Sequence, residues 1–240
     1  MYRSQISFRN NQIPMQSRRT FLTLGASTAI ATTAGCTASM PFVGDDPMEF
    51  DADPASIPQS ALDETGYDEH EIEDIGIERT FEAGGQTQDV VVTNWQAEYD
   101  KAIDLGELGV PIDERLRAAV CTALTTPQVS VLNRTFNPVG EMTSEELAEK
   151  VQDRYEGMEN LEQVDEDTVS ITRESTTVGE FEGEADLVGE GIPIDLTLHI
   201  TEAVESGDDF VVGVGGYPTE LRSDERPNIV SLLEAIEHNG

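Results

Sequence analysis

Basic residues and cysteine are scarce in this chain of 240 residues. It has 14 Lys and Arg against 48 Asp and Glu, giving a formal net charge of −34, and it has two cysteines. Proteins that bind DNA or RNA need a basic surface to contact phosphates. The composition therefore argues against nucleic acid as a partner, because a polyanion would be repelled.

Motifs of common catalytic chemistry are missing as well. The sequence after residue 36 contains no Gly-x-Ser-x-Gly, Walker or His-Glu-x-x-His motif. Its three histidines are scattered: His70 among carboxylates, His199 on what we expect to be the solvated face of a strand, and His238 where it would contact the dipole at a helix C-terminus. We expect no catalytic residue, no metal site and no cofactor, and a protein that is not an enzyme.

Long apolar runs are also absent. The longest candidate, from Phe21 to Ala34, has 14 residues, fewer than the roughly 20 needed for a transmembrane helix. It follows a segment that has four arginines and no acidic residue, and it leads to small residues and a cysteine. This order is typical of an export signal.

Two motifs in this region resemble known targeting signals. Ser17-Arg18-Arg19-Thr20-Phe21-Leu22 resembles a twin-arginine (Tat) signal, with Arg18, Arg19, Phe21 and Leu22 as its motif residues, and Thr33-Ala34-Gly35-Cys36 resembles a lipobox. The resemblance implies export in the folded state, cleavage before Cys36, and a lipid on Cys36 that anchors the protein at the extracytoplasmic face of the membrane. Met1 and Met15 are both possible starts, and we favour Met15.

The acidic excess grows when the first 35 residues are removed. The remaining 205 residues keep all 48 acidic residues but 10 of the 14 basic ones, a net charge of −38. Self-repulsion of this size is screened in molar salt, where the Debye length is about 3 Å. With its targeting motifs, the chain resembles the Tat-exported lipoproteins of halophilic archaea, and we interpret most of the acidic excess as a solvated, halophilic surface.

Composition divides the chain into three parts. We expect a signal peptide over residues 1–35, a flexible acidic tether rich in Pro, Asp, Ser and Gly over 36–58, and a single domain over 59–240. Asn133-Arg134-Thr135 is a sequon, so Asn133 is a possible N-glycosylation site. Cys121 lies in an apolar stretch and is expected to be a buried small side chain.

The first half of the domain reads mainly as strands. We expect a short helix over 59–65 that ends at Gly66, a hairpin of strands 71–82 and 87–99, and strands over 116–125 and 129–136. Alternation places Val91, Trp95, Ala97 and Tyr99 on one face, which makes Trp95 a core candidate.

The second half contains two helices. One follows Asn137-Pro138, with Thr143 and Glu146 as a capping box, and the other spans 224–238 with an apolar stripe. Between them we expect a strand whose Glu180, Glu182 and Glu184 face solvent, and further strands over 194–201 and 210–217, the last containing Gly213-Val214-Gly215-Gly216 for close packing. Asp165-Glu166-Asp167 is expected to be a turn.

These elements predict an α+β fold, an antiparallel sheet of about six to eight strands with helices packed on it. The order of elements resembles the Mog1/PsbP-like sandwich, through the helix after Asn137-Pro138-Val139-Gly140-Glu141-Met142, the strand with Phe181-Glu182-Gly183-Glu184-Ala185, and the helix with Asn228-Ile229-Val230 after Tyr217-Pro218. The fold serves several unrelated functions, so it implies no single one.

Three function classes follow. The leading hypothesis is a non-catalytic, lipid-anchored protein that binds an unidentified membrane or envelope protein. The alternative is a small-ligand binding protein associated with a transporter, which would need a deep pocket lined by Trp95 or tyrosines. An enzyme that uses Cys121 or His70 is the third hypothesis and the one that the sequence supports least.

Overall fold

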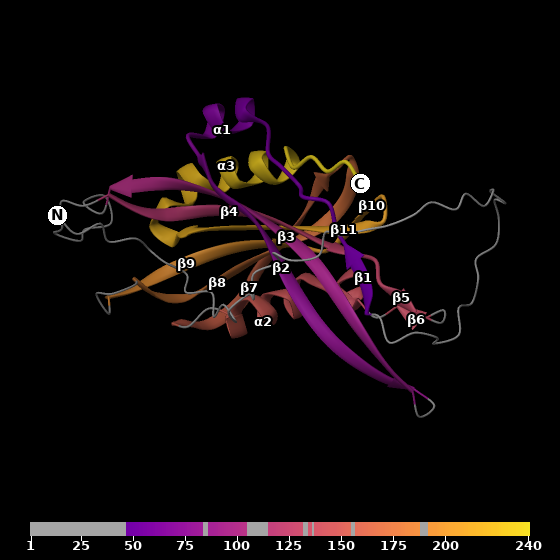
Figure 1. Ribbon diagram of the computed structural model, residues 1–240. Helices are drawn as coiled ribbons and strands as arrows, with labels where there is room; N and C mark the ends of the chain where they lie inside the picture. Colours follow the sequence, from indigo (N-terminus) through magenta and orange to yellow (C-terminus); the bar gives the residue numbers. More distant parts are fainter. Residues whose placement is uncertain are drawn as a thin grey trace, which may run out of the picture.

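A nine-stranded mixed β-sheet forms the centre of the molecule (Figure 1). The computed structural model describes residues 47–83, 86–104, 115–131, 134–135, 137–154, 157–187 and 192–240. The strands of this sheet are β1 (Met48–Asp51), β2 (Asp68–Ala83), β3 (Gln86–Asp104), β4 (Arg115–Pro127), β7 (Met158–Ile171), β8 (Glu174–Leu187), β9 (Ile192–Thr201), β10 (Val204–Ser206) and β11 (Asp209–Pro218).

The strand order is β1-β3-β4-β11-β9-β8-β7, with β2 also paired to β3 and β10 to β11. All pairs are antiparallel except β1 with β3, which is parallel. The prediction of a β-rich α+β sheet is confirmed in this coarse form. Its details are wrong, because the sheet has more strands than the six to eight expected and is mixed.

Local sequence signals account for several elements. Helix α1 (Gln59–Thr65) ends at Gly66, whose φ of 78° is the left-handed conformation that glycine favours at a helix C-terminus. Helix α2 (Ser144–Arg154) begins with the predicted capping box, in which the Glu146 backbone N–H donates to Thr143 Oγ1 and the Thr143 backbone N–H donates to Glu146 Oε2. The end of α1 and the start of α2 could therefore be predicted from one or two residues each.

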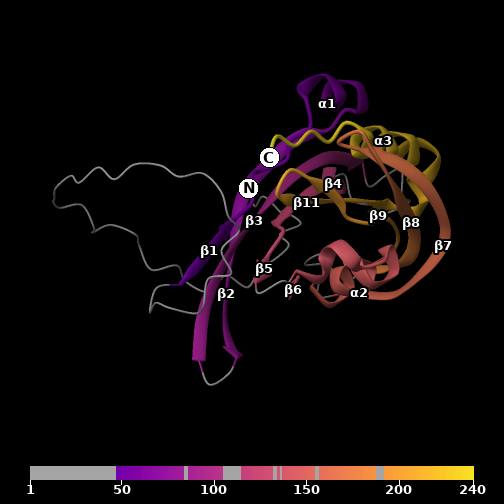
Figure 2. The same cartoon turned by 90° about the vertical axis from the view of Figure 1, so that its right-hand side faces the viewer.

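The helices cover both faces of the curved sheet (Figure 2). Helix α3 (Arg222–Glu234) packs against β4, β7 and β11 on the same side as α1, whereas α2 packs against β7, β8 and β9 on the opposite side. The core on the α3 side contains Tyr99, Cys121, Ile229 and Leu233, and the core on the α2 side contains Leu147, Phe181, Leu198 and Ile200. The apolar stripe predicted for the last helix is confirmed.

Residues 47–58 belong to the folded body. β1 pairs with β3, and Ala55 and Ile57 are 1% and 5% exposed in the core on the α3 side. The tether boundary predicted at Pro58 is therefore wrong. Composition misled because Pro and Asp are also common where a chain packs without regular structure.

The region after β4 differs from the expected single strand over 129–136. It forms a separate two-stranded sheet of β5 (Ser130–Val131) and β6 (Arg134–Thr135), followed by the 3₁₀ turn η2 (Pro138–Glu141). A second 3₁₀ turn, η3 (Thr219–Leu221), leads into α3. Within the described residues, no helix has the length and apolar character required to cross a membrane.

Candidate functional site

An apolar surface lies on the β2–β3 hairpin, which extends beyond the neighbouring strand β4 as an arm (Figures 1 and 2). Phe50 on β1 and Ile77 on β2 both pair with Val92 of β3, from opposite sides. Directly paired residues share a face of a sheet, and Met48 and Ile75 join them by twofold alternation. We call Met48, Phe50, Ile75, Ile77 and Val92 the arm patch. Met48 and Ile77 are 38% and 40% exposed.

The two edges of the large sheet differ in charge and regularity. On β7, the register shifts twice and exposed residues run from Glu162 to Thr168, including Val164, which is 47% exposed. Bulges and charges of this kind protect an edge from pairing with another chain. On β2, the register with β3 is regular from Glu71 to Ala83, and Ile75-Gly76-Ile77 carries no charge.

Asp165-Glu166-Asp167 lies within β7, so the predicted turn is wrong. Acidic residues are poor strand formers, but here the strand is fixed by pairing with β8, in which Glu166 is opposite Gly179 and Asp167 opposite Val178. Tertiary pairing therefore overrides the local preference.

A buried carboxylate and two arginines form the main charged cluster beneath α3. Glu180 is 3% exposed; its Oε2 accepts a hydrogen bond from Arg226 Nε at 3.0 Å, and its Oε1 forms an ion pair with Arg222 Nη2. Arg222 also donates to Glu182 Oε1 at 2.6 Å. The expectation that Glu180 faces solvent is wrong, because α3 covers this side of β8. Arg222 and Arg226, one helical turn apart in a chain with few bases, were the available signal.

His199 is the neighbour of Glu180 on β9 and is also buried, at 2% exposure. Its Nε2 lies 2.8 Å from the hydroxyl of Tyr217. Burial lowers the pKa of His199 to about 4, opposed by the charge of Glu180 and aided by Arg226 and Arg222. The imidazole is therefore neutral at physiological pH, and the prediction of a solvated His199 is wrong.

A small pocket opens beside this cluster, between β7 and α3. It is lined by residues that include Asp167, Glu180, His199 and Arg226, and its volume is about 70 Å³. Sites for drug-sized ligands have volumes of about 300–1,000 Å³. This pocket therefore has room for a few waters or an ion.

His70 lies beside two acidic residues of β3. Its Nδ1 is 3.5 Å from Asp100 Oδ2, and one ligand atom from each of His70, Glu98 and Asp100 lies within 4.8 Å of the other two. The sequence analysis found the carboxylates next to His70 along the chain but missed Glu98 and Asp100. These two residues are far from His70 in sequence, and the pairing of β2 with β3 brings them close to it. The hairpin prediction, followed residue by residue, was the signal that could have found it.

His238 joins the C-terminal segment to the β10–β11 hairpin. Its side chain is completely buried, with Nδ1 3.0 Å from Ser206 Oγ and Nε2 3.2 Å from both Asp209 Oδ2 and the Asp53 carbonyl oxygen. The expected contact with a helix end is wrong, since α3 ends at Glu234. In serine hydrolases the serine contacts Nε2 and the aspartate Nδ1. The arrangement here is the reverse, and we assign it a structural role.

The predictions that Cys121 and Trp95 are buried had opposite outcomes. Cys121 is fully buried, as predicted, and burial raises the pKa of its thiol to about 12. Trp95 is half-buried and is not among the core residues. Alternation placed Trp95 on the same face as the buried Ala97 and Tyr99, but the packed core ends before this part of β3.

Several predicted site residues lie outside the described residues. They are the Tat motif residues Arg18, Arg19, Phe21 and Leu22, the lipidation site Cys36, and the sequon residue Asn133.

Comparison with known proteins gives a family. A family model described as a domain of unknown function, DUF6517, matches residues 54–237. The chain belongs to the DUF6517 family. The match begins before Pro58, in agreement with the packing of the preceding residues in this DUF6517 protein.

This DUF6517 protein was also compared with proteins of curated function and with solved structures. No protein of curated function matches it. Among solved structures, it is similar to the solution structure of cyanobacterial PsbP (CyanoP) from Synechocystis sp. PCC 6803, at 12% identity and a TM-score of 0.36, over 85% of this chain and 99% of that one. The Mog1/PsbP-like fold stays a prediction.

Proposed function

We propose that this DUF6517 protein is a non-catalytic, lipid-anchored extracytoplasmic protein of a halophile, and that it binds a membrane protein partner through the arm patch. The observation that carries the proposal is the arm patch itself. Met48 and Ile77 are among the most exposed large apolar residues of the described chain, and they share one face of a three-stranded ladder. Contiguous apolar surface on an otherwise acidic protein marks an interaction site.

The position of the arm patch fits an anchor at Cys36. Twelve residues separate Cys36 from Met48, and an extended chain spans at most about 3.6 Å per residue, or roughly 40 Å in total. A lipid on Cys36 would hold β1 within this distance of the membrane. The arm patch, which includes two residues of β1, is then the apolar surface nearest to the anchor along the chain.

The charge of the chain favours a protein as the partner. The segment from Cys36 onwards has 10 basic residues against 48 acidic ones, so it offers few cations to the phosphates of anionic lipids or nucleic acids. A protein surface can offer apolar contacts to the arm patch and backbone groups to the open edge of β2, where a strand of the partner could add to the sheet.

The alternative of a small-ligand binding protein has less support. The three tyrosines of the described residues have internal partners: Tyr67 donates to Glu225, Tyr99 accepts from the Ile57 backbone N–H, and Tyr217 contacts His199. Trp95 lies on the sheet surface at half burial.

Cross-linking from two matched edge positions tests the proposal. Ile77→Cys and Val164→Cys each replace an exposed apolar residue on an edge strand, one within the arm patch and one on β7. Native Cys121 is buried, so its thiol should not react with the label. Each variant would be expressed in the host, labelled with a thiol-linked photo-cross-linker in isolated membranes at native salt, and analysed for protein adducts.

We expect one defined protein adduct at position 77, with a yield at least about tenfold higher than at position 164, as expected where one apolar anchor is fully covered. Equal yields at both positions, or no protein adduct at position 77, would contradict the proposal. Adducts to lipid alone at position 77 would mean that the arm patch contacts the membrane surface and not a protein partner.

A further inference from the structure

His70 occupies a bulge at the beginning of the β2–β3 ladder. Glu69 pairs with Tyr99 and Glu71 with Glu98, so the register of the ladder shifts by one residue at His70. A bulge of this kind redirects a side chain that regular alternation would place elsewhere. In this protein it leaves the imidazole Nδ1 3.5 Å from Asp100 Oδ2.

Glu98 and Asp100 stand two residues apart on β3 and therefore share a face. This face is opposite to the one that Tyr99 directs into the core on the α3 side. Asp100 is 5% exposed and Glu98 is half-buried, so both carboxylates have lost much of their hydration. Two partly buried carboxylates at this separation favour a cation between them.

We propose that His70, Glu98 and Asp100 bind a divalent transition-metal ion of the Zn²⁺ type. Ligand atoms of a Zn²⁺ ion lie about 2.0–2.2 Å from it, and so at most about 4.4 Å from each other. The three ligand atoms here lie within 4.8 Å of one another, so small side-chain rotations would bring them to this spacing around a bound ion. One nitrogen and two oxygens leave at least one coordination position for water or for a group of a partner.

The ligand types select the class of metal. Carboxylates alone suit Mg²⁺, Ca²⁺ and Mn²⁺, but an imidazole nitrogen favours Zn²⁺ and the later first-row transition-metal ions. Cys121, the cysteine of the described residues, cannot be a ligand here, because it pairs with Tyr99 and lies on the opposite face of the sheet. Glu98 is also held by a second contact, since Gln96 Nε2 donates to Glu98 Oε2 at 3.4 Å, as is common for residues that orient metal ligands.

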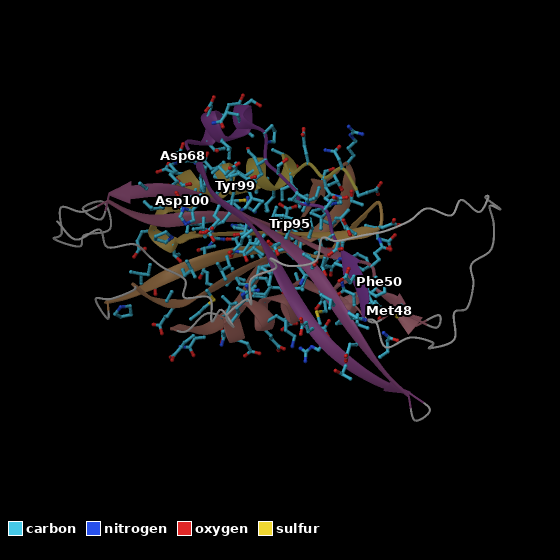
Figure 3. The ribbon with its side chains drawn as sticks, in the orientation of Figure 1. Met48, Phe50, Asp68, Trp95, Tyr99 and Asp100 are labelled. Carbon is cyan, nitrogen blue, oxygen red and sulfur yellow. The ribbon has the colours of Figure 1, made fainter. Side chains whose placement is uncertain are left out.

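The site is distinct from the arm patch, and its existence does not depend on the proposed partner. Asp100 pairs with Asp68 at one end of the β2–β3 ladder, whereas Met48 and Phe50 lie beside the middle of it (Figure 3). Six residues separate Glu98 from Val92 of the arm patch, a distance of about 20 Å along a strand.

Titration with zinc distinguishes a specific site from weak binding of Zn²⁺ to the many surface carboxylates. The full chain would be titrated with ZnCl₂ by calorimetry in molar NaCl with excess MgCl₂, which occupies weak carboxylate sites. The test variants are His70→Ala, which changes an exposed side chain, and Glu98→Gln, which keeps the shape of its residue. The matched control is Glu73→Gln, which removes a charge that acts on Glu98 without removing a proposed ligand.

We expect one saturable Zn²⁺ site per chain, weakened at least about tenfold by His70→Ala and by Glu98→Gln, and changed less than about threefold by Glu73→Gln. Circular dichroism would confirm that the variants are folded. If Glu98→Gln is not folded, the result for His70→Ala decides the test. Absence of saturable binding, displacement by Mg²⁺, or unchanged affinity in His70→Ala would overturn the proposal.

Discussion

Glu180 and His199 lie side by side on β8 and β9, and both are buried beneath α3. Their hydrogen-bond partners differ. Glu180 is paired with two arginines, whereas His199 has a neutral tyrosine as its partner, and burial lowers the pKa of His199. The molecule therefore holds its buried charge where α3 supplies cations.

The titration of His199 gives a prediction for stability. The pKa of His199 is lowered from 6.5 to about 4 in the folded chain, so the unfolded chain binds a proton in this range that the folded chain does not. The free energy of unfolding should therefore fall as the pH falls from about 6.5 to about 4, and this contribution should be complete above 6.5.

Denaturant unfolding of wild type and His199→Gln at about pH 7 and about pH 4.5 measures this effect. Wild type should lose about 1–2 kcal/mol more than the variant on acidification. Glu180, Arg222 and Arg226 act on His199 in wild type and remain in the variant, so the difference isolates the histidine. Equal losses in both proteins would refute the assignment.

At the scale of elements, α3 and β11 approach closely because β11 carries glycines. A Cβ on Gly215 would lie 2.3 Å from Ile229 Cγ2, and one on Gly213 would lie 2.5 Å from Leu233 Cδ2. The sequence already suggested close packing for this glycine run. The structure identifies α3 as the packing partner and shows that Ile229 and Leu233 are fully buried there.

Gly215→Ala should therefore destabilise the fold by about 1–3 kcal/mol, because the added methyl group displaces α3 from the sheet. Gly76→Ala on β2 is the matched control, since no atom lies within 4 Å of its added Cβ. That variant should change stability by about 0.5 kcal/mol or less. Thermal or denaturant unfolding measures both, and an equal effect at the two positions would contradict the close packing.

The elements that could be predicted are those specified by nearby residues. The hairpin of β2 and β3, the capping box at Thr143 and Glu146, and the apolar stripe of α3 each depend on residues a few positions apart. The parallel pairing of β1, the bulge at His70 and the burial of Glu180 depend on residues far away in sequence. Alternation shows which residues share a face, but it does not show what covers that face.

At the scale of the whole molecule, the acidic excess lies mainly on the surface, and three of the few basic residues pair with buried carboxylates. Lys101 and the two arginines of α3 pair with buried carboxylates, Lys101 with Glu225 and the arginines with Glu180. The exposed acids cover a sheet with helices on both sides, and the arm patch interrupts this acidic surface. The proposed lipid on Cys36 gives the arrangement its orientation, because it holds the arm patch near the membrane.

Mass spectrometry of the protein purified from the membranes of its own host tests the central claim most directly. The account predicts a chain that begins at Cys36 and carries a lipid on the sulfur of that residue. A chain that retains the segment with Arg18 and Arg19 and has a free thiol at Cys36 would contradict the anchor and, with it, the proposed orientation of the arm patch.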